Sequence, residues 1–108
     1  MSIIRYDKLV RDRIPEIIEN SGRRCVCSIL SDDAYLTKLE AKLNEELAEY
    51  QESKSIEELA DLLEVIRAVA VARGSSFDEV ESIRMAKATA RGGFERKILL
   101  EEVSDCEG

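Results

Sequence analysis

Two pairs of carboxylates stand at helical spacing near the middle of this chain. Glu46 precedes Glu49 by three residues, and Glu58 precedes Asp61 by three residues. Residues three apart on a helix share a face and lie about 4.5 Å apart along its axis. If two such helices pack together, the carboxylates repel one another unless water or a cation neutralises them. Mg²⁺ and Mn²⁺ prefer ligand sets made of oxygen, so the pattern predicts a divalent-metal site.

The net charge of −7 is concentrated around these residues. Residues 40–64 contain nine acidic and two basic side chains, and the rest of the 108-residue chain is balanced. Affinity for nucleic acids comes largely from basic residues that neutralise phosphates, so this distribution argues against a nucleic-acid partner. Charge alone leaves one alternative open, which is a pair of solvated acidic helices without a ligand.

Some kinds of chemistry are excluded by the composition. The chain has no histidine, which removes His-based nucleophilic catalysis and His-rich zinc sites. Its cysteines, Cys25, Cys27 and Cys106, lack the paired CxxC spacing of a zinc site. The longest apolar run, residues 68–72, is too short to cross a bilayer, and no signal-peptide pattern is found. We therefore expect a reduced, cytoplasmic protein without a membrane partner.

The elements that must position the carboxylates are predicted to be two helices. Apolar residues recur at three- and four-residue steps on both sides of a short polar break. We expect one helix from a cap at Asp32 or Asp33 to about residue 52. A second helix should begin after Ser55, which forms a capping box with Glu58, and should end before Gly74. The short loop between them makes the pair antiparallel.

Further helices are expected over residues 11–20 and 76–90, and two short strands over residues 24–30 and 97–103. The sequence thus predicts a single all-α domain over residues 1–108, with about four helices and at most two peripheral strands. Two helices cannot enclose a core, but two copies can pack their apolar faces into a four-helix bundle. We therefore predict a homodimer or a homotetramer.

The carboxylate pairs also carry a resemblance to a known family. The sequence ELAE at residues 46–49, followed by ELAD at residues 58–61, resembles the E-x-x-E … E-x-x-D motif of the all-α NTP pyrophosphatase (MazG-like) superfamily. Residues 6–15 (YDKLVRDRIP) resemble the opening of its short members. Those members are described as predicted house-cleaning NTP pyrophosphatases or phosphoribosyl-ATP pyrophosphohydrolase-like proteins. Further similarity to this group covers residues 42–46, 57–66 and 87–95.

The resemblance implies Mg²⁺-dependent cleavage between the α- and β-phosphates of a nucleoside triphosphate, with release of the monophosphate and pyrophosphate. The implied ligands of Mg²⁺, or of Mn²⁺ in its place, are Glu46, Glu49, Glu58 and Asp61. Glu46 is the first candidate for the base that activates water and Glu45 the second, because neighbouring negative charge raises the pKa of a carboxylate. The basic residues that could reach the triphosphate are Lys8, Arg11, Arg13, Lys87 and Arg91.

Two other functions fit the same helices. One is a phosphoribosyl-ATP pyrophosphohydrolase, although residues 6–15 resemble the house-cleaning group, which acts on non-canonical nucleotides. The other is a non-catalytic helical dimer that binds a cation or a partner protein, and it needs no converging carboxylates. None of these motifs specifies the base or the sugar of the nucleotide.

Overall fold

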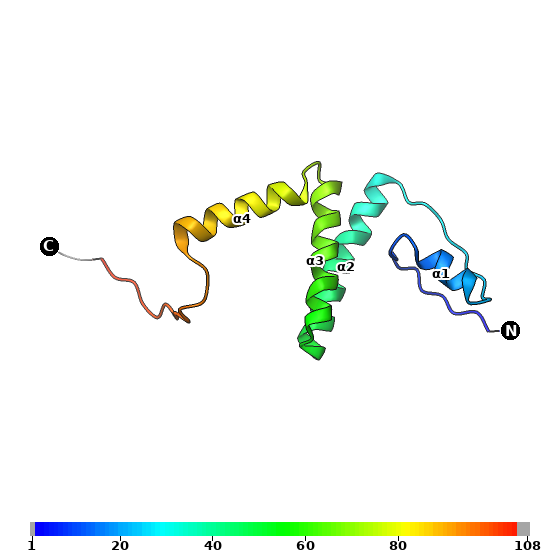
Figure 1. The fold of residues 1–108 in the computed structure, drawn as a ribbon, viewed down its shortest axis with the longest axis horizontal. Helices are drawn as coiled ribbons and strands as arrows, with labels where there is room; N and C mark the ends of the chain where they lie inside the picture. The colour runs from blue at the N-terminus through cyan, green and yellow to red at the C-terminus, as the bar shows by residue number, and fades with distance from the viewer. Residues whose placement is uncertain (1, 106–108) are drawn as a thin grey trace. The chain divides into compact units, whose positions relative to one another are not determined.

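The computed structural model describes residues 2–105, and four α-helices account for most of them (Figure 1). The helices are α1 (Ile14–Asn20), α2 (Asp32–Ser53), α3 (Ile56–Ala72) and α4 (Phe77–Arg91). No strand occurs in this part of the chain, so the all-α class and the expected number of helices are confirmed. None of the helices described is both long and apolar enough to span a membrane.

The prediction of two short strands over residues 24–30 and 97–103 is wrong. Both segments lack regular secondary structure. A strand needs a hydrogen-bonded neighbour, and neither segment has a partner strand within residues 2–105. The first segment instead lies against α1, where the Cys25 thiol donates to the Pro15 carbonyl oxygen at 3.8 Å.

Helix α2 begins after Ser31, whose hydroxyl accepts a hydrogen bond from a backbone N–H of the first turn at 3.2 Å. The cap is therefore Ser31 and not one of the two aspartates predicted for that role. Asp32 and Asp33 instead place negative charge in the first turn, where the helix dipole favours it. The helix ends at Ser53, and Lys54 adopts a left-handed conformation with φ 57° that turns the chain back.

Helix α3 follows directly after Ser55. The Ser55 hydroxyl accepts the Glu58 N–H at 3.3 Å, which confirms the predicted cap. The return half of the capping box is not formed, because the Ser55 N–H donates to the Ser53 hydroxyl at 3.2 Å. The Glu58 Oε2 atom has no hydrogen-bond partner among the described residues, so this carboxylate is left for other ligands.

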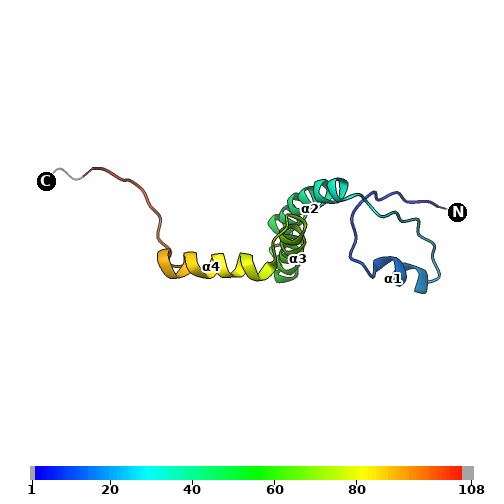
Figure 2. The same ribbon diagram turned by 90° about the horizontal axis from the view of Figure 1, so that it is seen from above.

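Helices α2 and α3 form an antiparallel hairpin and lie side by side in both views of the ribbon (Figures 1 and 2). The buried apolar residues of the described chain are Leu39, Val65 and Ala70. Other leucines of the same two helices stay open to solvent: Leu47 is 45% exposed and Leu63 is 49% exposed. A single hairpin therefore has a small core and leaves apolar surface uncovered.

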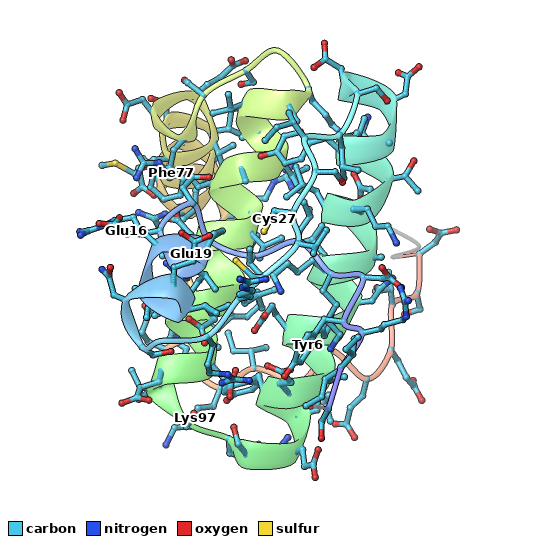
Figure 3. The ribbon with its side chains drawn as sticks, turned by 90° about the vertical axis from the view of Figure 1, so that its right-hand side faces the viewer. Tyr6, Glu16, Glu19, Cys27, Phe77 and Lys97 are labelled. Carbon is cyan, nitrogen blue, oxygen red and sulfur yellow. The ribbon has the colours of Figure 1, made fainter. Side chains whose placement is uncertain are left out.

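The chain divides into two compact units, one ending at Phe77 and the other beginning at Asp78. The first unit contains α1, α2 and α3, and it holds all four predicted metal ligands. Figure 3 labels Tyr6 in its N-terminal segment, and Lys8 of the same segment reaches Glu45 on α2. The second unit contains nearly all of α4, whose ends agree with the predicted range of residues 76–90 to within one residue.

Candidate metal centre

Glu46 lies on the face of α2 that packs against α3. It continues the apolar stripe of Leu39, Leu43 and Tyr50 at three- and four-residue steps, so the helix carries a carboxylate into its own packing face. The residue is 7% exposed, and its Oε2 atom is buried without a hydrogen-bond partner among the described residues. A buried, unpartnered carboxylate oxygen is costly, so this atom marks a place where a cation would be stabilising.

Two groups of carboxylates meet at Glu46. Across the hairpin, Glu46, Glu58 and Asp61 each place one oxygen within 4.8 Å of the others. Along α2, Glu45, Glu46 and Glu49 do the same. The structure thus brings the four predicted ligands into two overlapping groups that share Glu46. We call Glu46, Glu49, Glu58 and Asp61 the carboxylate cluster.

Burial and mutual repulsion change the proton affinities within the carboxylate cluster. Burial raises the pKa of Glu46, and the negative charge of Glu49 raises it further. Burial also raises the pKa of Glu58, and Glu49 and Asp61 add to the effect. Carboxylates whose ionised form is disfavoured in this way are the ones that a divalent cation would stabilise most.

Two of the five basic residues predicted to bind substrate lie at the edge of the cluster. The Lys8 Nζ donates to Glu45 Oε1 at 3.0 Å, and the Arg11 Nη2 donates to Asp61 Oδ1 at 2.9 Å. The hydrogen bond from Lys8 lowers the pKa of Glu45, since it stabilises the carboxylate. Glu45 in turn raises the pKa of Lys8. The N-terminal segment therefore brings positive charge to acidic residues of both α2 and α3.

The remaining basic candidates are placed differently. Arg13 pairs with Glu16 at 3.6 Å, at the start of α1, and both side chains are well exposed. Lys87 and Arg91 lie on α4, in the second unit. Contact of these three residues with a nucleotide stays a prediction.

Lys42 is a candidate that sequence reasoning missed. Its Nζ lies 3.5 Å from Glu46 Oε1, and its side chain is 22% exposed. The four-residue spacing of Lys42 and Glu46 on one helix could have predicted this ion pair. Lys42 is a counter-ion to a carboxylate that a bound metal would also engage.

The donor atoms suit a hard divalent cation. Carboxylates supply every candidate ligand, and Mg²⁺ and Mn²⁺ favour such oxygens over nitrogen or sulfur. The two buried oxygens without partners, Glu46 Oε2 and Glu58 Oε2, are the atoms that a cation would satisfy. An arrangement of this kind can hold a metal ion and, through it, the oxygens of a phosphate.

Comparisons with known proteins do not identify a function for this chain. No protein-family model matches the chain, and no solved structure matches it. An uncharacterised protein of Mycolicibacterium smegmatis is 62% identical over 42 residues, which cover 39% of this chain and 43% of that protein. The chain therefore matches less than half the length of that relative.

The raised pKa values predict how stability depends on pH when no metal is present. A folded-state pKa above the ordinary value of 4.5 means that the folded protein binds protons more tightly than the unfolded chain. Glu46 and Glu58 therefore favour folding at low pH, and this contribution is lost as the pH rises from 4.5 through the raised pKa values. Glu45 and Glu81, whose pKa values are lowered, stabilise the fold above 4.5 and lose that effect below it.

In a buffer with a metal chelator, we expect the melting temperature to rise as the pH falls from neutral toward 4.5 and to decrease below that value. Thermal melts followed by circular dichroism measure this. The Glu58→Gln variant should flatten the rise, whereas Glu52→Gln, a change at an exposed position of α2, should preserve it. A melting temperature that falls continuously from neutral pH downward would contradict the raised pKa values.

Proposed function

We propose that this chain is a Mg²⁺-dependent pyrophosphohydrolase of nucleoside triphosphates, of the MazG-like kind. The observation that carries the proposal is the pair of buried oxygens without partners, Glu46 Oε2 and Glu58 Oε2, within the carboxylate groups. A solvated acidic surface would leave its carboxylates in water, whereas Glu46 is 7% exposed at a contact between helices. The E-x-x-E … E-x-x-D pattern of residues 46–61 supports the same interpretation.

Each side chain of the site has a proposed role. The ligands of Mg²⁺ would be Glu46, Glu49, Glu58 and Asp61. When bound, the ion supplies positive charge to the phosphate oxygens of the transition state. Glu46, which belongs to both carboxylate groups, is the first candidate to accept a proton from water, and Glu45 is the second, because Lys8 lowers its pKa. Arg11, which contacts Asp61, would hold phosphate oxygens beside the metal ligands.

The proposed substrate is a free nucleotide, cleaved between its α- and β-phosphates to a nucleoside monophosphate and pyrophosphate. The resemblance of residues 6–15 to house-cleaning enzymes favours non-canonical nucleotides and a cytoplasmic role. Two basic residues of this segment contact acidic residues of the central helices. Lys8 pairs with Glu45 on α2, and Arg11 pairs with Asp61 on α3. Basic groups at that position are suited to the negative charge of a triphosphate.

We also propose that the protein acts as a homodimer or a homotetramer. Three exposed apolar residues of α3, Ile56, Leu59 and Leu63, follow one another at three- and four-residue steps. A cavity of about 200 Å³ beside this stripe is lined by Ala60, Leu63 and Phe77, and at its charged side by Glu64 and Arg67. A small domain with a thin core is commonly stabilised by a second copy. A second hairpin packed on this face would complete a four-helix bundle.

A panel of nucleoside triphosphates with pyrophosphate detection tests the proposed reaction. We expect at least one member to give pyrophosphate and the monophosphate in Mg²⁺ and neither product in EDTA. Asp61→Asn should keep the helical circular dichroism spectrum and lower the rate by about 10- to 100-fold or more, because it weakens a metal ligand.

The same panel separates the competing functions. A strong preference for phosphoribosyl-ATP would reassign the protein to that hydrolysis. No product from any nucleotide, from a protein that binds Mg²⁺, would instead support a non-catalytic cation-binding dimer.

A further inference from the structure

A cavity of about 90 Å³ lies between the N-terminal segment and α2. Lys8, Lys38 and Lys42 line it together with Asp7 and Glu45. Three ammonium groups against two carboxylates give the cavity an excess of positive charge. We call this cavity the lysine pocket.

The lysine pocket adjoins the carboxylate cluster along one face of α2. Lys38, Lys42 and Glu46 follow one another at steps of four residues, so neighbours are about 6 Å apart along the helix axis. Glu45 lines the pocket and also belongs to the carboxylate group of Glu46 and Glu49. A single ligand could therefore contact the cluster with one end and the pocket with the other, over a span of about 12 Å.

The lysines of the pocket differ in the ion pairs that they make. Lys8 lies 3.0 Å from Glu45, and Lys42 lies 3.5 Å from Glu46. Lys38 makes no ion pair with any residue in the described part of the chain. A cation bound to Glu46 would compete with Lys42 for this carboxylate. Lys42 could then pair with an anionic ligand in place of Glu46. The pocket thus offers one lysine without an ion pair and a second that metal binding would release.

The size of the pocket restricts what it can bind. Pockets that enclose drug-sized molecules have volumes of about 300–1,000 Å³. A volume of about 90 Å³ is well below that range and suits a small anion better than a nucleoside. Lysine ammonium groups bind phosphate as point charges and do not require one orientation of it.

We propose that the lysine pocket is the subsite for the β- and γ-phosphates of the substrate, and for pyrophosphate after cleavage, with Lys38 and Lys42 as its binding residues. This assignment rests on the proposed pyrophosphohydrolase function. The order of charges along α2 fits such a ligand, because the acids can hold a metal-bound phosphate while the lysines hold the free phosphate oxygens beyond it.

Calorimetric titration of inorganic pyrophosphate into the full chain, with Mg²⁺ at saturation, tests the subsite. We expect the wild type to bind and Lys38→Met to bind about tenfold more weakly, since it loses one charge-assisted contact. The affinity for a nucleoside monophosphate should not change. Lys54→Met removes a lysine that lies directly after the C-terminal end of α2, and this variant should bind pyrophosphate as the wild type does.

The outcomes separate this subsite from the hydrolase itself. The proposed subsite would be contradicted by a wild type that does not bind pyrophosphate. It would also be contradicted by Lys38→Met and Lys42→Met variants that bind pyrophosphate normally. Both results would count against the subsite even if the protein hydrolyses nucleotides. If no nucleotide is hydrolysed but Lys38→Met still weakens pyrophosphate binding, the subsite is supported and the proposed reaction is not.

Discussion

The Glu46→Gln variant is expected to melt at a higher temperature than the wild type in metal-free buffer and to lose metal-dependent pyrophosphate release. Glutamine keeps the shape of the side chain but removes a buried charge that is repelled by Glu49 and Asp61. For a domain of this size, each kcal/mol relieved raises the melting temperature by about 4–8 °C. Loss of a metal ligand should lower the rate by at least about 100-fold. Thermal melts in EDTA and the pyrophosphate assay measure the two effects.

The matched control is Glu52→Gln, which removes a negative charge from an exposed position of the same helix, outside both carboxylate groups. It should leave the melting temperature and the rate close to those of the wild type. A lower melting temperature for Glu46→Gln in metal-free buffer would show that the ion pair with Lys42 outweighs the repulsion. The buried charge would then be structural, and the metal centre would lose its main support.

The Leu63→Asp variant is expected to dissociate the oligomer and to unfold at a temperature at which the wild type is folded. Leu63 is 49% exposed in the single chain and is the last of the three exposed apolar residues in the stripe of α3. An aspartate there would be buried without a partner in the bundle, and loss of a packed leucine alone costs about 2–5 kcal/mol. Analytical ultracentrifugation gives the mass, and circular dichroism gives the stability.

The comparison for this variant is Ile3→Asp, which introduces the same charge at a position that is 83% exposed in the N-terminal segment. It should remain an oligomer with nearly unchanged stability. The proposed bundle would be contradicted by a wild type that sediments as a stable monomer at micromolar concentration. It would also be contradicted by a Leu63→Asp variant that assembles normally.

Local sequence signals were sufficient for the central hairpin. The hydroxyl of Ser55 and the left-handed turn at Gly74 mark the ends of α3, because caps and stops depend on nearby atoms. The three-residue spacings of the acids also placed the carboxylate cluster, since a helix fixes which residues share a face. The helix ends and the carboxylate cluster were therefore predictable because each depends on residues within one or two turns of helix.

Features that depend on distant residues could not be predicted in the same way. The contact of Lys8 with Glu45 joins residues 37 apart, and that of Arg11 with Asp61 joins residues 50 apart. No local pattern specifies which acid each base meets, so Lys38 and Lys42 were also missed as lining residues of one pocket. The alternation in residues 24–30 indicated a strand, but a strand forms only if a neighbour pairs with it. The cap of α2 is Ser31 and not Asp32, and the sequence pattern did not distinguish them because serine and aspartate accept the capping hydrogen bond about equally well.

The claim that the acids of α2 and α3 bind a divalent cation is tested most directly by calorimetric titration of Mn²⁺ or Mg²⁺ into the metal-free protein without nucleotide. We predict saturable binding by the wild type and by Glu52→Gln, and loss of that binding in Glu46→Gln and Asp61→Asn. No saturable binding by the wild type, or equal binding by all four proteins, would contradict the claim.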